Sequence, residues 1–208
     1  MVSDVIRLLL ADDQALVRGA LATLLGLEGD LEVVAQVGRG DEVAAAVEAH
    51  APDVCLLDIE MPGLDGIEAC RLVARGPARP TGPRVLVVTT FGRPGYLRRA
   101  LEAGASGFVV KDTPAGELAD AVRRVHAGLR VVDPDLATAS LLDGPSPLTE
   151  READVLRLAL DGAPVASIAA ALHLSGGTVR NHLSAAIGKT STTTRVEAAR
   201  VARDRGWI

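Results

Sequence analysis

The run VIRLLLADD at residues 5–13 decides how the first part of this chain folds, because two carboxylates directly follow a strand-like apolar run. The arrangement returns in VCLLD at 54–58 and GFVVK at 107–111, and the apolar run VLVV at 85–88 ends in Thr89. The carboxyl ends of parallel strands meet at one edge of a sheet, so these polar side chains are expected to converge. The sequence therefore predicts an α/β domain with one polar site at that edge.

Three carboxylates, those of Asp12, Asp13 and Asp58, are expected to crowd together at this edge. They cannot all stay ionised in an apolar frame without a counter-charge, and ligands that are all oxygen suit Mg²⁺ better than a transition metal. Lys111 and Thr89 beside that metal supply the positive charge and the hydroxyl that an incoming phosphoryl group needs. These residues predict a Mg²⁺-dependent site for placing phosphate on an aspartate.

Strand-like and helical stretches alternate over the first part of the chain. The strand-like runs are 5–11, 31–37, 53–57, 84–89 and 107–110, and the helical stretches lie near 15–27, 40–50, 65–75, 95–103 and 115–128. Strands separated by helices of this length indicate βα units and a parallel sheet covered on both faces. Five such units predict a flavodoxin-like, doubly wound, five-stranded parallel sheet over residues 1–128.

A linker is expected after this domain. The runs DPD at 133–135 and DGPSP at 143–147 contain proline and glycine at a density that breaks helices. We therefore place the linker at 129–146, with a short helix at 135–142, and a second domain at 147–208.

The second domain has no strand pattern and is expected to be a small all-α domain. Thr149 followed by Glu152 has the spacing of a capping box that starts a helix. The expected helices cover 149–160, 168–172, 178–187 and 193–205, with a tight turn at 173–175. A short helix, a tight turn and an amphipathic helix are typical of a helix-turn-helix.

The third of these helices is the predicted DNA-reading element. Its residues 179, 183 and 187 are apolar and share one face, which leaves the opposite face free to enter a major groove. Side chains on that face can bond base edges, while residues near the two helix ends are better placed for phosphates. The predicted base contacts are Arg180, Asn181 and Ser184, and the predicted phosphate contacts are Thr178 and Lys189.

Charge and composition favour a soluble protein of the cytoplasm. The net charge is −5, but residues 1–128 carry 13 basic and 18 acidic side chains, whereas residues 148–208 carry 8 basic and 6 acidic ones. Different partners are therefore expected for the two parts. No apolar run approaches the roughly 18 residues of a membrane helix, and the start of the sequence has no signal-peptide core. Cys55 and Cys70 lack metal-site spacing and are interpreted as core thiols in a reducing compartment.

Several motifs, in order, resemble a known family over essentially the whole chain. The Asp12-Asp13 pair, DIEMPGLDG at 58–66, TT at 89–90 and GASGFVVKD at 104–112 resemble the receiver domain of two-component response regulators. LTEREADVLRLALDG at 148–162 and LSGGTVRNHLS at 174–184 resemble the LuxR-type output domain of the NarL/FixJ class. PDVCLLDIEMPG, TTFGRPGYLRRAL, GTVRN and the terminal GW resemble DesR-type regulators of membrane-lipid desaturation.

The resemblance implies a role for each residue of the predicted site. Asp58 would be the phospho-acceptor, and Asp13 and Asp58 would bind Mg²⁺ directly. Asp12 would bind it through water, and the backbone carbonyl of Glu60 would complete the shell. Lys111 would neutralise the phosphoryl oxygens, Thr89 would swing to bond them, and Phe108 would rotate inward as the switch aromatic.

The resemblance also implies partners. A sensor histidine kinase would supply the phosphoryl group, promoter DNA in double-stranded form would be the target, and phosphorylation would favour a homodimer. The chain would then regulate transcription, with membrane-lipid desaturation genes as candidate targets. It would not be an enzyme beyond its own phosphoryl transfer and dephosphorylation.

Two other readings compete with this one. A phosphatase of the haloacid-dehalogenase type also uses aspartate, Mg²⁺ and lysine, but it needs a second aspartate two residues after the nucleophile. Asp58 is followed by Glu60 and Asp12 by Gln14, so the fit is poor. A receiver whose output half binds protein instead of DNA is the third reading, and a gel shift with promoter DNA would separate it from the first.

The segment after the third output helix departs from the family pattern. The family has leucine at the position of Thr190 and an aliphatic residue at the position of Thr192, and both pack the last two helices together. Two threonines there lose apolar burial of about 1–2 kcal/mol each. Gly188 and the Gly176-Gly177 pair weaken the ends of the helix as well. The sequence thus predicts an output domain that is loose, or ordered only on DNA.

Overall fold

A computed structural model describes residues 5–75, 82–90, 92–142, 145–160 and 162–208. Residues 1–4, which bear on the expected absence of a signal-peptide core, lie outside these ranges. The first two residues of the DGPSP run, 143 and 144, also lie outside them. The chain divides into two compact units, of which the first comprises residues 1–92 and 97–137 and the second comprises residues 93–96 and 138–208. No helix among the described residues is both long enough and apolar enough to cross a bilayer.

Strands and helices alternate from residue 6 to residue 142, which covers the first unit and the start of the second, as the sequence predicts. In chain order they are β1 (Ile6–Ala11), α1 (Ala15–Leu25), β2 (Leu31–Val37), the short 3-10 helix η1 (Gly40–Glu42), α2 (Val43–His50), β3 (Val54–Leu57), α3 (Gly66–Arg75), β4 (Arg84–Thr89), α4 (Pro94–Ala103), β5 (Gly107–Val110), α5 (Ala115–His126), β6 (Val131–Val132) and α6 (Pro134–Leu142). Every predicted strand and helix of this part is present.

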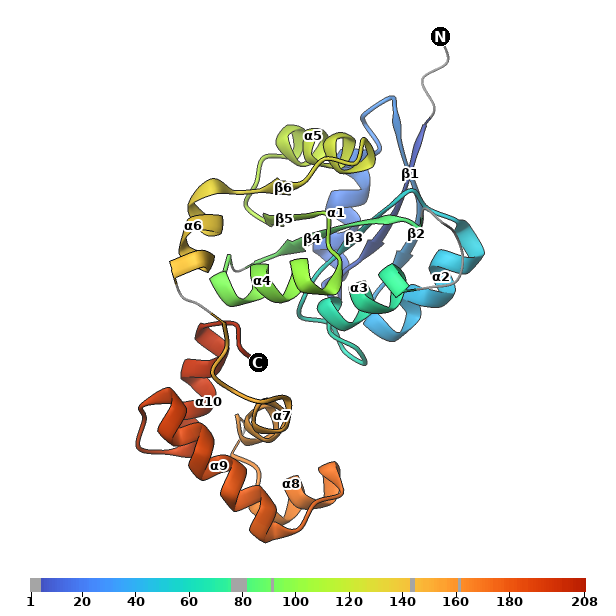
Figure 1. Cartoon of the computed structure of the whole chain (residues 1–208). Helices are drawn as coiled ribbons and strands as arrows, with labels where there is room; N and C mark the ends of the chain where they lie inside the picture. Colours follow the sequence, from blue (N-terminus) through green and yellow to red (C-terminus); the bar gives the residue numbers. More distant parts are fainter. Residues whose placement is uncertain (1–4, 76–81, 91, 143–144, 161) are drawn as a thin grey trace. The chain divides into compact units, whose positions relative to one another are not determined.

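The sheet is parallel throughout, with the strand order β2-β1-β3-β4-β5-β6. The chain thus moves outward from β1 in one direction and returns to continue in the other, which is the doubly wound order of flavodoxin-like folds. Figure 1 shows α2, α3 and α4 together on one face of the sheet and α5 on the other. The predicted fold class is confirmed.

The core explains why the strands are almost continuously apolar. On one face, strand residues such as Leu8, Leu56 and Leu86 pack with Leu25 of α1 and Val122 of α5 in a single buried cluster. All four residues of β3 are buried, because helices cover this central strand on both faces. Aliphatic side chains therefore fill the core in a chain that has few aromatic residues.

The prediction of five strands was one too few. Val131 and Val132 form β6, which pairs with Gly107 and Phe108 of β5 in parallel register. The pair lies between Gly128 and Pro134, so the strand is only two residues long and shows no alternation that a sequence pattern could reveal. The segment expected to be a linker accordingly contains both this edge strand and α6.

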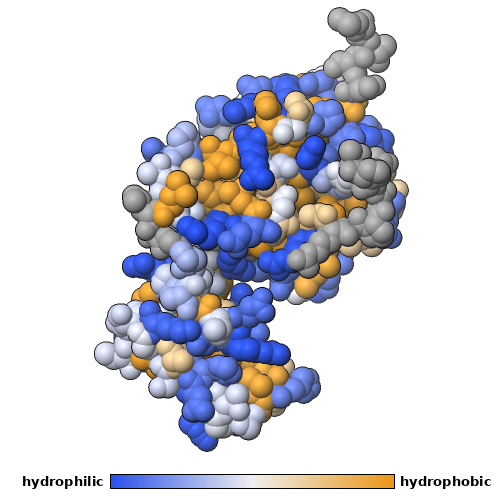
Figure 2. Space-filling model, in the orientation of Figure 1, coloured by the Kyte–Doolittle hydropathy of each residue, from blue (hydrophilic) through white to orange (hydrophobic). Residues whose placement is uncertain are grey.

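Apolar side chains gather on the face of the first unit shown in Figure 2, in the region of β5 and β6. A hollow of about 540 Å³ lies there, and Phe108, Val110, Val131 and Leu136 supply apolar parts of its wall. Charged residues of α5, including Glu117 and Arg124, complete the wall. The edge of the sheet next to α5 is therefore incompletely filled.

The second unit contains four further helices, as predicted. They are α7 (Glu150–Ala159), α8 (Val165–Leu172), α9 (Gly176–Thr190) and α10 (Arg195–Asp204). The capping box is present, because the Thr149 hydroxyl accepts the Glu152 N–H and the Glu152 carboxylate accepts the Thr149 N–H. His173 ends α8 in a left-handed conformation, and Ser175 then caps α9. These residues make the tight turn of a helix-turn-helix.

The second unit has a packed core in spite of the threonines that end and follow α9. Its core joins Leu156, Ile168, Leu183 and Ala199, one from each helix, in one buried cluster. Thr190 is buried, and its hydroxyl donates to the carbonyl oxygen of Ala186 at 2.8 Å. The threonine therefore replaces the missing apolar contact with a satisfied hydrogen bond, which removes the cost of burying a lone hydroxyl.

Candidate functional site

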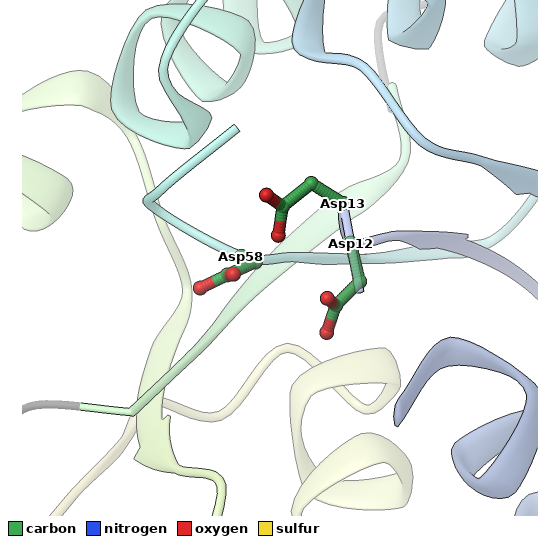
Figure 3. Close-up of side chains that lie close together, drawn as sticks. All are labelled: Asp12, Asp13 and Asp58. Atoms are coloured by element: carbon green, nitrogen blue, oxygen red, sulfur yellow. The ribbon is translucent and has the colours of Figure 1, made fainter. Parts of the chain in front are cut away.

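The three predicted carboxylates lie together at the C-terminal edge of the sheet. Asp12 and Asp13 follow β1, Asp58 follows β3, and these strands are neighbours in which Ala11 is paired with Leu57. One carboxylate oxygen from each of the three residues lies within 4.8 Å of the others (Figure 3). Asp12 and Asp58 are buried and Asp13 is exposed, so the cluster opens to solvent on the Asp13 side.

Lys111 reaches this cluster from the end of β5. Its Nζ lies 2.8 Å from Oδ2 of Asp12 and 2.8 Å from Oδ2 of Asp58. The backbone N–H of Lys111 also donates to the carbonyl oxygen of Thr89 at 2.8 Å, and this bond joins the end of β5 to the end of β4. Three carboxylates facing one ammonium leave two negative charges when all are ionised, which matches the charge of one divalent cation.

Burial and charge act in opposite senses on the two residues in this contact. Burial raises the pKa of Asp58, with the neighbouring Asp12 adding to it, and the bonds from Lys111 and Ile59 only partly offset the rise. Burial lowers the pKa of Lys111, but its bonds to Asp12 and Asp58 outweigh that and raise the pKa overall. The lysine therefore stays charged, and a further cation near Asp58 would favour its ionised form.

The backbone after Asp58 is held by very close packing. The Ile59 N–H donates to Oδ1 of Asp58 at 2.7 Å, and the Gly66 N–H donates to the carbonyl oxygen of Ile59 at 2.9 Å. A Cβ atom at Gly66 would lie 1.8 Å from the carbonyl oxygen of Asp58. Only glycine fits there, so the first residue of α3 fixes the main chain of Asp58.

The other predicted receiver residues surround this cluster in different ways. Thr89 ends β4 with 1% of its surface exposed, and Phe108 in β5 is fully buried. The Phe108 ring thus already lies inside the domain. The rotation expected from the family resemblance would instead bring the ring inward from an outer position. Glu60 has an exposed side chain in the loop between β3 and α3.

Sequence reasoning missed two contacts that position the acidic pair and the loop after Asp58. Arg18 of α1 donates to the backbone carbonyl of Asp12. The Gly40 N–H donates to the carbonyl oxygen of Pro62 at 3.1 Å, and a Cβ at Gly40 would lie 2.0 Å from the carbonyl oxygen of Leu64. A glycine in a turn between β2 and α2 was the available signal, but its contact partner is remote in sequence.

In the second unit, α9 presents the predicted polar face. Val179 and Leu183 are buried in the core, whereas Arg180, Asn181 and Ser184 are exposed. The helix turns about 100° per residue, so the exposed residues share the side opposite the core. The structure therefore brings the three predicted base contacts to one accessible face.

The two predicted phosphate contacts have partners within the domain. The Thr178 hydroxyl lies 2.8 Å from the Ser175 hydroxyl at the start of α9. Lys189 Nζ lies 2.7 Å from Oε2 of Glu152, a carboxylate that is buried. Burial raises the pKa of Glu152, but the bonds from Lys189 and Thr149 lower it below its usual range. No sequence pattern indicates this contact between α7 and α9.

Comparison with known proteins assigns both units. Residues 8–123 match the response regulator receiver domain, and residues 146–202 match the bacterial regulatory proteins of the luxR family. The transcriptional regulatory protein DesR of Bacillus subtilis is 41% identical over 203 residues, with 98% of this chain and 99% of that protein covered. Response regulator RamR of Streptomyces coelicolor is 42% identical over 207 residues, with 98% of each covered.

A solved structure supports the same assignment. Response regulator ChrA of a heme-sensing two-component system is 33% identical, with a TM-score of 0.57 and coverage of 98% of this chain and 99% of that one. A receiver fold with an acidic site, followed by a helix-turn-helix unit, defines a two-domain signalling protein. The chain belongs to the response regulator family with a LuxR-type output domain, as its motifs predict.

Family membership also decides between the readings that the sequence left open. DesR is a transcriptional regulatory protein, and the second unit matches the bacterial regulatory proteins of the luxR family, so the chain is a regulator of transcription and not a metabolic enzyme. The phosphatase reading is thereby excluded. The match to the luxR family disfavours an output half that binds only protein.

Proposed function

We propose that this chain is a transcription regulator switched on by phosphorylation of Asp58 from a sensor histidine kinase. The observation that carries the proposal is the contact of Lys111 with Asp58, beside Asp12 and Asp13, at the C-terminal edge of the sheet. In phosphoryl transfer, positioning and neutralisation of the equatorial oxygens supply most of the catalysis. Receiver, linker and output domains are assigned to residues 1–128, 129–146 and 147–208.

Mg²⁺ is the cation that we assign to the acidic cluster. The donors are all carboxylate oxygens, they close to within 4.8 Å of one another, and their charge exceeds that of Lys111 by two. Such ligands suit Mg²⁺. As the family resemblance implies, Asp13 and Asp58 would bind it directly, Asp12 would bind it through water, and the Glu60 carbonyl would complete the set.

The switch is assigned to Thr89 and Phe108. An acyl phosphate on Asp58 adds one to two negative charges at the end of β3, next to the end of β4, and so attracts the Thr89 hydroxyl. Phe108 forms part of the wall of the hollow beside α5, so a change in its ring position would alter that surface. The switch is a population shift between two states. In the state described by this structure the Phe108 side chain is buried.

Double-stranded DNA is the proposed partner of α9. Arg180, Asn181 and Ser184 are assigned to base edges, and Thr178 to a phosphate near the helix start. The phosphorylated chain would form a homodimer that places two copies of α9 on half-sites about one helical turn apart. The sensor histidine kinase and the DNA would both meet this chain in the cytoplasm. The DesR-type motifs make membrane-lipid desaturation genes the first targets to examine.

Phosphorylation-dependent DNA binding tests the proposal. The chain is incubated with acetyl phosphate and Mg²⁺, and its affinity for a duplex selected from a random pool by the phosphorylated chain is measured by fluorescence anisotropy. Phosphorylation should tighten binding and shift the chain from monomer to dimer in sedimentation, and Asp58→Asn should do neither. Equal affinity and equal mass with and without acetyl phosphate would refute it.

A further inference from the structure

An ion pair of the output domain joins the end of α9 to the start of α7. Lys189, the last residue but one of α9, donates to both carboxylate oxygens of Glu152, at 2.7 and 3.0 Å. The Glu152 side chain is 7% exposed and that of Lys189 is 36% exposed. The contact therefore lies at the edge of the core, with its acceptor inside and its donor at the surface.

The same carboxylate also holds the start of α7. Oε2 of Glu152 accepts the Thr149 N–H at 2.7 Å, so one oxygen serves both the capping box and the lysine. Glu152 would be a buried charge without Lys189, and removing one partner of such a pair is far more disruptive than the net value of the pair suggests. The ion pair with the buried Glu152 carboxylate therefore holds the Lys189 side chain within the domain.

This bond completes the set of contacts that orient α9. Near its start and middle the helix is held by Val179 and Leu183 in the core. At its end, the Thr190 hydroxyl donates to the carbonyl oxygen of Ala186 within the same helix. The Lys189–Glu152 contact is thus a polar link between the last turn of α9 and α7.

We propose that Glu152 and Lys189 are positioning residues for DNA recognition, because their bond sets the angle at which α9 presents Arg180 and Asn181. A site is only as well aligned as the residues that support it, and a rigid helix transmits a shift at one end to its whole exposed face. Lys189 then acts through Glu152 and not through a phosphate. The inference rests on the proposed binding of DNA by α9.

Salt dependence separates the two roles of Lys189. Affinity for the selected duplex is measured over a range of salt for the full chain and for Lys189→Met, Glu152→Gln and the double variant. Each single variant should lose about tenfold in affinity, and the double variant should lose no more, since both remove one shared contact. The slope of log affinity against log salt should stay at the wild-type value, whereas loss of a phosphate contact lowers it by about one.

A matched control separates positioning from general stability. Thr149→Ala removes the hydroxyl that caps α7 but keeps the Thr149 N–H and the lysine contact, so it should lower the thermal stability of the domain without changing DNA affinity. Lys189→Arg, which keeps the charge and the donors, should restore most of the affinity lost in Lys189→Met.

Two results would overturn the inference. One is a salt slope lower by about one in Lys189→Met together with wild-type affinity in Glu152→Gln, since that identifies a phosphate contact. The other is an affinity loss in Thr149→Ala as large as that in Glu152→Gln, since that identifies lost stability. A wild-type chain that binds no duplex at all would instead refute the proposed function of α9.

Discussion

The ammonium of Lys111 lies 2.8 Å from a carboxylate oxygen of Asp58, and the same ammonium lies 2.8 Å from Asp12. One cation at the end of β5 therefore links the ends of β1 and β3 across the parallel sheet. Asp13, the third carboxylate, is exposed and lies on the open side of the cluster. The arrangement divides the acidic residues by contact, since Asp12 and Asp58 share the ammonium of Lys111 and Asp13 faces the solvent.

Phosphorylation should depend on Asp58 and not on Asp53, the two aspartates that flank β3. Asp58→Asn should gain no phosphate from acetyl phosphate with Mg²⁺, because the amide has no nucleophilic carboxylate oxygen. Asp53→Asn is the control, since Asp53 bonds the Arg7 N–H at the opposite end of the strand and should still be phosphorylated. Intact-mass spectrometry reads both, and a phosphate on Asp58→Asn would remove the assignment.

Asp13→Ala should weaken Mg²⁺ binding more than Asp12→Ala does. Asp13 is exposed and assigned as a direct ligand, whereas the Asp12 carboxylate already accepts bonds from Lys111 and from the Gln14 N–H at 2.9 Å. A Mg²⁺ titration followed by NMR chemical shifts measures both affinities. Trp207 lies in the other domain and cannot report the binding, and equal losses in the two variants would contradict the division of roles.

Much of this site can be read from the sequence because the relevant signals are local. Each strand is a short apolar run, and the polar residue that ends it falls at the same edge by topology alone. The capping box of Thr149 and Glu152 is likewise a spacing within four residues. The Lys189–Glu152 bond was missed because its partners are 37 residues apart and neither residue belongs to a pattern with the other.

Two further differences between the predicted and the observed structure also depend on contacts that a local sequence pattern does not specify. Strand β6 is too short for a periodic pattern, and it forms because β5 offers an unpaired edge. Thr190 was expected to loosen the packing because its hydroxyl was counted as polar, but a helical threonine can bond the carbonyl four residues back. Both outcomes depend on three-dimensional neighbours that local pattern does not specify.

Two glycines should respond in opposite directions to the same substitution. Gly66→Ala should lower the free energy of unfolding by about 1–3 kcal/mol, since its Cβ would overlap the carbonyl oxygen of Asp58. Gly19→Ala, in α1, has nothing within 4 Å of the new Cβ and should raise it by about 0.5–1 kcal/mol. Urea unfolding compares the two. A stabilised Gly66→Ala would show that the loop after Asp58 relaxes freely.

The two cysteines should be inert in the folded chain. Burial raises the pKa of Cys55 and of Cys70 to about 12, from an ordinary thiol value of 9.0. A thiol reagent at pH 8 should react slowly with the folded chain and rapidly in denaturant, because the reactive species is the thiolate. Fast reaction of the folded chain would contradict the burial.

The same shifts give a sign to the dependence of stability on pH. Between pH 9.0 and about 12 the unfolded chain releases thiol protons that the folded chain retains. The unfolded state then binds fewer protons, so the free energy of unfolding falls as pH rises through this window. Cys70→Ala should show a shallower fall than the wild type over the same range, and identical slopes would exclude a contribution from Cys70.

Asn181 should carry sequence information, and Arg180 should carry both information and charge. Asn181 is exposed on α9 and can form paired hydrogen bonds with adenine, so Asn181→Ala should lose about 1–3 kcal/mol on the selected duplex and little on random DNA. Arg180→Ala should weaken both complexes. Arg200→Ala removes the same charge from an exposed position on α10 and should change the selected complex less than Arg180→Ala does. If Asn181→Ala protects the selected site in a footprint as the wild type does, α9 does not read bases through this residue.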